Sequence, residues 1–196
     1  PDQVNFPNRK LLLDLLEQKR GAILLSGHIG NLELCQAIAN LRGHIRLNIL
    51  VHTKHAEKFN RLLGGSKGSA TIQLIQVTEL NPTVAINLQQ KIDQGEFLVL
   101  VGDRIPVSGG RIVQANFLGK KAEFPQGPYL LASLLRCPMY TLFCFNVDGR
   151  FHIDLGLFAE SIRIPRSEQQ RLQMLETLAR RYAERLEAHC RATPFQ

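Results

Sequence analysis

Residues 21–33 read Gly-Ala-Ile-Leu-Leu-Ser-Gly-His-Ile-Gly-Asn-Leu-Glu, and the rest of the chain is organised around this stretch. Its first half is short, apolar and rich in residues that favour strands. After it, leucine and isoleucine recur at helical spacing up to Leu41. The stretch therefore predicts a strand over 21–26 that leads through a tight turn into a helix over 31–42.

His28 and Glu33 lie at this junction, five positions apart. That spacing would separate them around a helix, but a histidine in the turn can meet a carboxylate in the first helical turn. We predict a hydrogen bond of about 2.6–3.2 Å between imidazole and carboxylate, which would fix the tautomer and raise the basicity of the other ring nitrogen. The free N–H groups at the start of the helix, near Asn31, would stabilise a nearby anion.

A structural interpretation of the same pair is also open. His28 would cap a turn, and Glu33 would be an acidic residue favoured by the helix dipole. The glycines on both sides of His28 and the strand-to-helix junction favour the functional interpretation.

Strands and helices alternate through the first hundred residues. Strands are predicted over 45–51, 71–77 and 97–101, and helices over 7–20, 54–63 and from Asn81 to Gly95. Residues 103–126 are expected to form a substrate-handling loop region around one short strand, 112–117. A helix over 126–136, a hairpin of strands 139–147 and 150–158, and a long helix over 167–191 follow. The fold class is therefore α/β, with a mostly parallel central sheet flanked by helices, a C-terminal β-hairpin and a long helix.

Composition limits the possible functions. A chain of 196 residues predicts a single domain, and the net charge of +7 suits a partner that carries phosphate or carboxylate. No apolar run is long enough to cross a membrane, and the four cysteines form no metal-ligand motif, so no metal is expected. The chain begins without Met, so we expect it to be part of a longer membrane-associated protein.

Five segments carry a resemblance to one family. They are Gly27-His28-Ile29-Gly30-Asn31-Leu32-Glu33, the basic segment around Lys54, Asp103-Arg104 after a buried strand, the run from Phe117-Leu118-Gly119 to Pro125-Gln126-Gly127, and Pro138. In this order and spacing they resemble the lipid A late-acyltransferase family of the lysophospholipid acyltransferase superfamily. The family more often has Trp at position 32 and Arg near position 54.

The resemblance implies an acyltransferase whose catalytic residues are His28, as general base, and Glu33, which orients it. It implies substrate-binding roles for Asn31, Lys54, Asp103, Arg104 and Gly127. The donor would be acyl carrier protein or a coenzyme A thioester, with no further cofactor. The acceptor would be a lipid at an anionic membrane surface on the cytoplasmic face of the bacterial inner membrane.

The predicted sheet gives an independent reason to group these residues. His28, Asp103 and the residues before Lys54 all follow strands, and the carboxyl ends of parallel strands share one edge, where ligands bind. We expect a common crevice there that opens into an apolar groove for the acyl chain and has basic residues at its mouth. The alternatives for Lys54 and for Asp103-Arg104 are a solvated lysine and a local ion pair or turn cap.

A non-catalytic basic module that binds anionic lipid or nucleic acid would also explain the charge. It would not explain the ordered motifs, and a chain without Trp and with 7% aromatic residues has little basis for stacking on nucleobases. No nucleic-acid partner is therefore expected.

Overall fold

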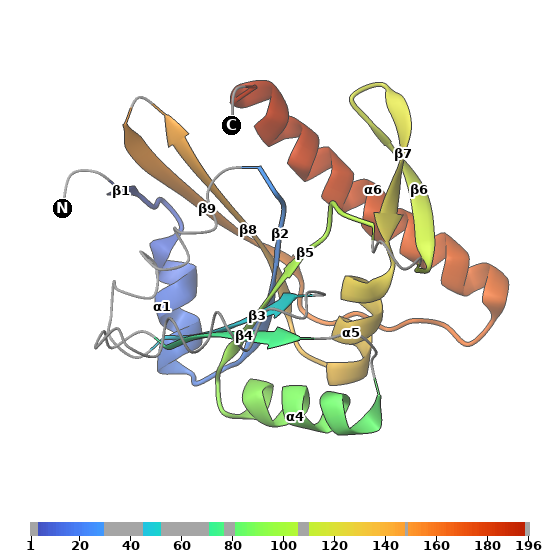
Figure 1. Ribbon diagram of the computed structural model, residues 1–196, viewed down its shortest axis with the longest axis horizontal. Coiled ribbons are helices and arrows are strands. Elements are labelled where there is room, and N and C mark those ends of the chain that lie inside the picture. The colour runs from blue at the N-terminus through green and yellow to red at the C-terminus, as the bar shows by residue number, and fades with distance from the viewer. Residues whose placement is uncertain are drawn as a thin grey trace.

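A computed structural model describes residues 4–29, 45–51, 71–76, 81–105, 110–147 and 149–194. It has a central sheet with helices on both faces and a separate two-stranded ribbon beside the last helix (Figure 1). The helices are α1 (Arg9–Glu17), α4 (Pro82–Asp93), α5 (Gly127–Leu135) and α6 (Glu168–Ala192). The strands are β1 (Val4–Asn5), β2 (Ala22–Ser26), β3 (Arg46–Val51), β4 (Thr71–Gln76), β5 (Phe97–Val101), β6 (Ile112–Phe117), β7 (Lys120–Pro125), β8 (Met139–Val147) and β9 (Arg150–Ala159).

Within the described ranges, seven strands form one sheet in the order β1-β9-β8-β2-β5-β3-β4. The strands from β8 to β4 are mutually parallel, whereas β9 runs antiparallel to β8 and forms the predicted hairpin with it. The predicted α/β class with a mostly parallel sheet, a hairpin and a long last helix is confirmed.

Alternate residues of the buried strands serve two cores, because successive side chains of a strand point to opposite faces. Ile23 and Leu25 of β2 pack with α4, α5 and α6 on one face. Ala22 and Leu24 pack on the other face with Leu12 of α1. Burial on both faces explains why β2 and β5 appear in the sequence as continuous apolar runs.

Most predicted elements appear within one or two residues of their expected bounds. Asn81 caps α4, since its side chain accepts a hydrogen bond from the N–H of Val84 at 2.9 Å. The first helix is shorter than the predicted 7–20 and covers Arg9–Glu17. The helices predicted over 31–42 and 54–63 lie outside the described residues.

The region 103–126 contains more regular structure than the sequence predicted. A second strand, β7, pairs antiparallel with β6 and forms a ribbon that packs against α6 (Figure 1). Its charged residues obscured the strand pattern, but Ala122 and Phe124 alternate with outward-facing residues and point toward the core. The prediction of a single short strand in this region was therefore incomplete.

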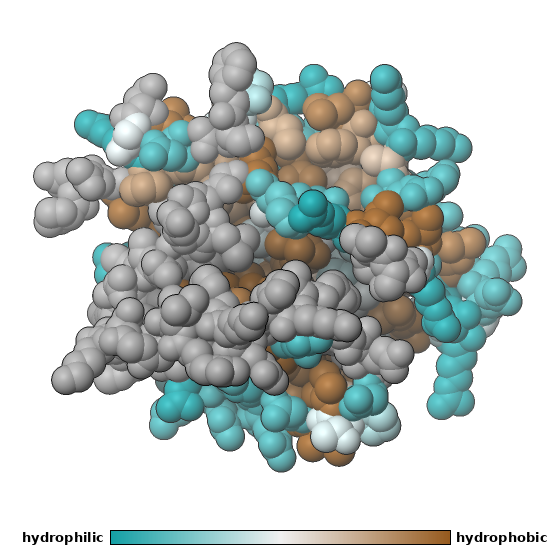
Figure 2. All heavy atoms as spheres, viewed as in Figure 1, coloured by the Kyte–Doolittle hydropathy of each residue, from teal (hydrophilic) through white to brown (hydrophobic). Residues whose placement is uncertain are grey.

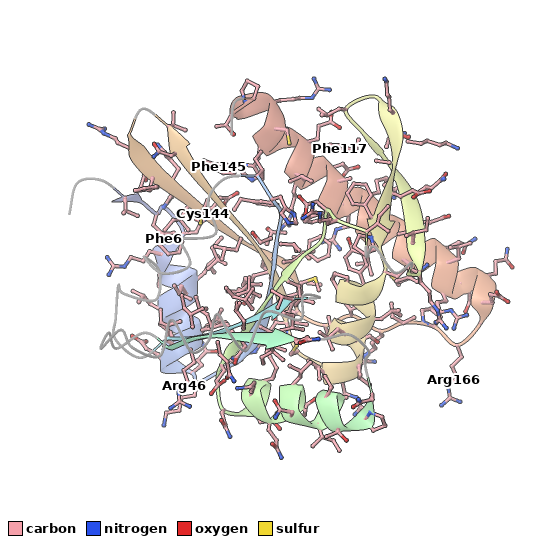
Figure 3. The ribbon with its side chains drawn as sticks, in the orientation of Figure 1. Phe6, Arg46, Phe117, Cys144, Phe145 and Arg166 are labelled. Atoms are coloured by element: carbon pink, nitrogen blue, oxygen red, sulfur yellow. The ribbon has the colours of Figure 1, made fainter. Side chains whose placement is uncertain are left out.

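A buried carboxylate joins the amino ends of the central strands. Glu96, just before β5, accepts hydrogen bonds from Asn48 at 2.9 Å, from Arg46 at 3.1 Å and from Lys91 at 3.2 Å. Figure 3 labels Arg46 at the start of β3. Burial alone would raise the pKa of Glu96, but these three partners outweigh it and lower the pKa below its ordinary value.

Glu96→Gln is expected to reduce the free energy of unfolding by about 1–3 kcal/mol at pH 7, because an amide NH₂ would replace one of the two accepting oxygens and face its donors. A carboxyl with a lowered folded pKa stabilises the fold above its unfolded pKa of about 4.3 and loses that effect as pH falls through the folded value. The difference between wild type and variant in urea unfolding should therefore shrink in acid. Glu160→Gln, which breaks only an exposed ion pair with Arg20, is the control and should change stability by less than about 0.5 kcal/mol.

Candidate active site

His28 and Asp103 make a two-point contact beyond the ends of β2 and β5. The imidazole Nδ1 lies 2.8 Å from Oδ1 of Asp103, and the backbone N–H of His28 donates to Oδ2 at 2.6 Å. Because a carboxylate can only accept, the neutral ring would carry its proton on Nδ1 and keep the lone pair of Nε2. The histidine side chain is 48% exposed and that of the aspartate 17%, so the ring is anchored on one side and accessible on the other.

The register of the sheet creates this contact. Ser26 pairs with Val101, so His28 and Asp103 occupy matching positions two residues past their strands. The N–H of Gly102 donates to the carbonyl of Ser26 at 2.9 Å and extends the pairing toward the site. The expectation that His28 and Asp103 share one edge of the sheet is confirmed.

The connections of these two strands leave in opposite directions. The chain passes from β2 to β3, beyond β5, and from β5 to β8, beyond β2. Neighbouring strands whose connections run in opposite directions along the sheet define a topological switch point, where open α/β sheets bind their ligands.

A tyrosine from α6 forms a hydrogen bond with the end of β2, next to the site. The hydroxyl of Tyr182 is buried and donates to the carbonyl of Ser26 at 2.8 Å. Burial, and next the charge of Asp103, raise the pKa of Tyr182 well above its ordinary value, so the phenol stays protonated as a donor. In the sequence, Tyr182 follows the apolar spacing of one helix face, and no local signal marks its contact with β2.

Gly27 is required by the same packing. A Cβ at this position would lie 3.1 Å from Oδ2 of Asp103 and 3.1 Å from the hydroxyl of Tyr182. Both distances are shorter than ordinary van der Waals contact, so glycine lets Asp103 and Tyr182 approach the turn together.

We expect Gly27→Ala to lower turnover roughly tenfold by displacing Asp103 from His28, because small displacements of catalytic groups are costly. Steady-state kinetics together with circular dichroism would separate this effect from unfolding. Gly156→Ala is the matched control: its Cβ would meet its nearest neighbour at 3.5 Å, and activity should be retained. Equal losses in the two variants would contradict the packing argument.

The other predicted site residues divide into two groups. Glu33, Asn31 and Lys54 lie outside the described residues, so the predicted bond between His28 and Glu33 stays a prediction. Arg104 is exposed directly after Asp103, and Gly127 is the first residue of α5. Within the part of the chain that is described, no atom lies within 4 Å of a Cβ built on Gly127, which leaves the start of this helix open.

Gln126 is the residue directly before α5. Its side-chain amide donates to the carbonyl of Ile112 at 2.9 Å, and its backbone N–H donates to the carbonyl of Arg111. A carboxylate could not donate the first of these bonds. Gln126 therefore joins the start of α5 to the ribbon.

The cysteines near the core are poor nucleophiles. Burial raises the pKa of Cys137 to about 11, and burial followed by the charge of Asp103 raises that of Cys190. No group of three metal-ligating side chains occurs among the residues with described positions. Over the same residues, no helix is long and apolar enough to cross a membrane.

Comparison with known proteins identifies the family. Residues 2–196 match the family described as bacterial lipid A biosynthesis acyltransferase, which is nearly the whole chain. A search of curated proteins finds no match. The matched region contains the strand, turn and aspartate that form the site, and it agrees with the resemblance carried by the motifs. The chain belongs to the bacterial lipid A biosynthesis acyltransferase family and is an acyltransferase of that kind.

Proposed function

We propose that the chain moves a fatty acyl group from an acyl-thioester donor to a hydroxyl of a lipid or glycolipid acceptor, with His28 as the general base. The observation that carries this proposal is the contact between Nδ1 of His28 and Asp103 at the switch point of the sheet. It leaves Nε2 as an acceptor with no hydrogen-bond partner among the described residues, on a half-exposed ring, which is what a general base for a lipid hydroxyl requires.

The reaction balances without an enzyme nucleophile. Nε2 of His28 takes the proton of the acceptor hydroxyl as its oxygen attacks the thioester carbonyl. The tetrahedral intermediate then collapses, the bond from carbon to sulfur breaks, and the thiolate leaving group recovers the proton from the imidazolium. Asp103 stabilises the imidazolium, because the charge develops within hydrogen-bonding distance of its carboxylate.

Asp103 thereby takes the orienting role that the motif assigned to Glu33. Because Asp103 already contacts Nδ1, Glu33 is not needed as the partner of that nitrogen. We keep Glu33 in the proposed catalytic machinery as a second carboxylate near His28 in sequence. N–H groups near Asn31 would hold the oxyanion. Lys54 and Arg104 would bind phosphate groups, and the open backbone at Gly127 would contact substrate.

The proposed donor is acyl carrier protein or a coenzyme A thioester, and the proposed acceptor lies in an anionic membrane. The net charge of +7 supports an acidic carrier and anionic headgroups alike. With such partners the enzyme would work at the cytoplasmic face of the bacterial inner membrane.

The direct test is to supply acyl carrier protein thioester and coenzyme A thioester separately, with a lipid extract that contains hydroxylated glycolipids. Mass spectrometry should detect an acceptor whose mass rises by one acyl group and a matching release of free thiol. Thiol release without an acylated lipid would show a thioesterase and contradict the proposal.

A further inference from the structure

The ribbon of β6 and β7 ends in an unusual turn. Phe117 pairs with Lys120, so Leu118 and Gly119 form a two-residue loop, and both have positive φ, 49° and 79°. This is the backbone of a type I′ turn, in which Asn-Gly is strongly preferred. A leucine at the first position carries a steric penalty, because left-handed backbone crowds its Cβ.

Burial does not compensate for this penalty. Leu118 is 47% exposed at the tip of the ribbon. The turn is also fixed to α6. The N–H of Leu118 donates to Oε2 of Glu187 at 2.8 Å, and Arg191 forms an ion pair with the other oxygen of that carboxylate at 2.7 Å. The structure thus holds an apolar side chain in an unfavourable backbone conformation and presents it to the surroundings.

Two cationic side chains lie beside Leu118, while the nearby carboxylate of Glu187 is paired with Arg191. Lys120 and Lys121 follow the turn directly, and both are exposed. Figure 2 shows hydrophobic surface next to projecting hydrophilic side chains at the upper right, where the ribbon lies in Figure 1. An apolar tip with adjacent lysines is complementary to an anionic bilayer, with acyl chains below a layer of phosphates.

A chain of packed aromatic side chains links the tip to the active site. Phe117 lies between the ribbon and α6 (Figure 3) and packs edge-on against Phe124, which packs in the same way against Tyr182. Tyr182 in turn holds the carbonyl at the end of β2, two residues before His28. In Figure 1 the tip of the ribbon points to the same side of the molecule as the carboxyl end of β2.

We propose that the tip of the β6–β7 ribbon docks the enzyme on an anionic lipid bilayer. Leu118 enters the interface, and Lys120 and Lys121 contact headgroup phosphates. This inference rests on the proposed function, because docking on a bilayer brings the active site to its acceptor only if the acceptor is a membrane lipid. It can be tested without turnover, so its failure and that of the proposed function are distinguishable.

The chain contains no tryptophan, which allows a local probe. Leu118→Trp places a single indole at the tip, and Leu134→Trp places one on a leucine with similar exposure, 51%, near the end of α5. That end faces the amino edge of the sheet, because β8 begins four residues after α5 ends. With vesicles of phosphatidylglycerol and phosphatidylethanolamine, only Leu118→Trp should show a blue shift and quenching by brominated acyl chains.

A second variant separates docking from folding. Leu118→Asn supplies the residue that the turn prefers, so its thermal midpoint should equal or exceed that of wild type. Its binding in vesicle co-sedimentation should nevertheless fall about tenfold, because the inserted apolar group is gone. Lys120→Gln and Lys121→Gln should each weaken binding to anionic vesicles about fivefold and leave binding to neutral vesicles unchanged.

Activity on detergent-dispersed acceptor should be unchanged in Leu118→Asn, since the tip contacts no reacting atom. Equal quenching of the two tryptophans, or unaltered co-sedimentation of Leu118→Asn, would overturn the proposal. So would a raised KM for an acyl carrier protein donor with unaltered vesicle binding, because the tip would then be a carrier-docking element.

Discussion

His28→Ala is expected to lower turnover of an acyl-thioester donor and a lipid acceptor by ~10²–10⁴-fold, the usual contribution of a general base. The variant should fold normally, because the ring is half exposed and its side-chain contact is made to a residue at the same edge of the sheet. Steady-state acyl transfer and circular dichroism measure the two quantities. Binding to anionic vesicles should be unchanged, since His28 is not part of the ribbon.

His152→Ala provides a control for the loss of a histidine. His152 also contacts a polar side chain, Asn5, at 3.1 Å, but this contact joins β9 to the edge strand β1. Its replacement should leave turnover within about twofold of wild type, because exposed contacts of this kind contribute little. Full activity in His28→Ala would refute the mechanism.

Asp103→Asn should reduce kcat by about 10²–10⁴-fold with a much smaller change in KM. The amide can still accept the N–H of His28 through its oxygen, but its NH₂ group would face Nδ1 and favour the tautomer in which Nε2 carries the proton. The ring would then remain in place as the wrong tautomer. A merely structural role for Asp103 would instead lower stability and leave the pH dependence of kcat unaltered.

Asp154→Asn is the matched control, because Asp154 forms the other side-chain contact between a histidine and an aspartate among the described residues. Its Oδ2 lies 3.0 Å from Nε2 of His189, and that hydrogen bond lowers the pKa of Asp154. It joins β9 to α6 and should matter for stability and not for turnover. Glu33→Gln should reduce activity less than Asp103→Asn, since Asp103 would still fix the ring; a larger loss in Glu33→Gln would return the orienting role to Glu33.

The sequence allowed the strands of the sheet and their shared edge to be predicted, because β2 and β5 are apolar on both faces and are separated by helical patterns. The same argument placed Asp103 on the edge that carries His28. It could not predict their direct contact. That contact depends on β5 inserting between β2 and β3, and strand order is a non-local property that alternation alone does not determine.

Two further features were beyond local sequence patterns. Tyr182 reaches Ser26 across 156 residues of sequence, and its position in α6 resembles that of any core residue. The strand β7 was missed because Lys120, Lys121 and Glu123 make it look like a loop, although its inward residues pack on α6. Both features depend on how α6 lies across the sheet, which appears only in three dimensions.

The proposed mechanism requires that Nε2 of His28 is an unprotonated base while Asp103 holds the proton on Nδ1. Two-bond ¹H–¹⁵N spectra of the histidine-labelled protein at neutral pH measure this state, with His28→Ala to assign the signal. We expect an unprotonated Nε2 and a protonated Nδ1 in wild type, and the reverse tautomer in Asp103→Asn. A protonated Nε2 in the wild-type enzyme would contradict the mechanism.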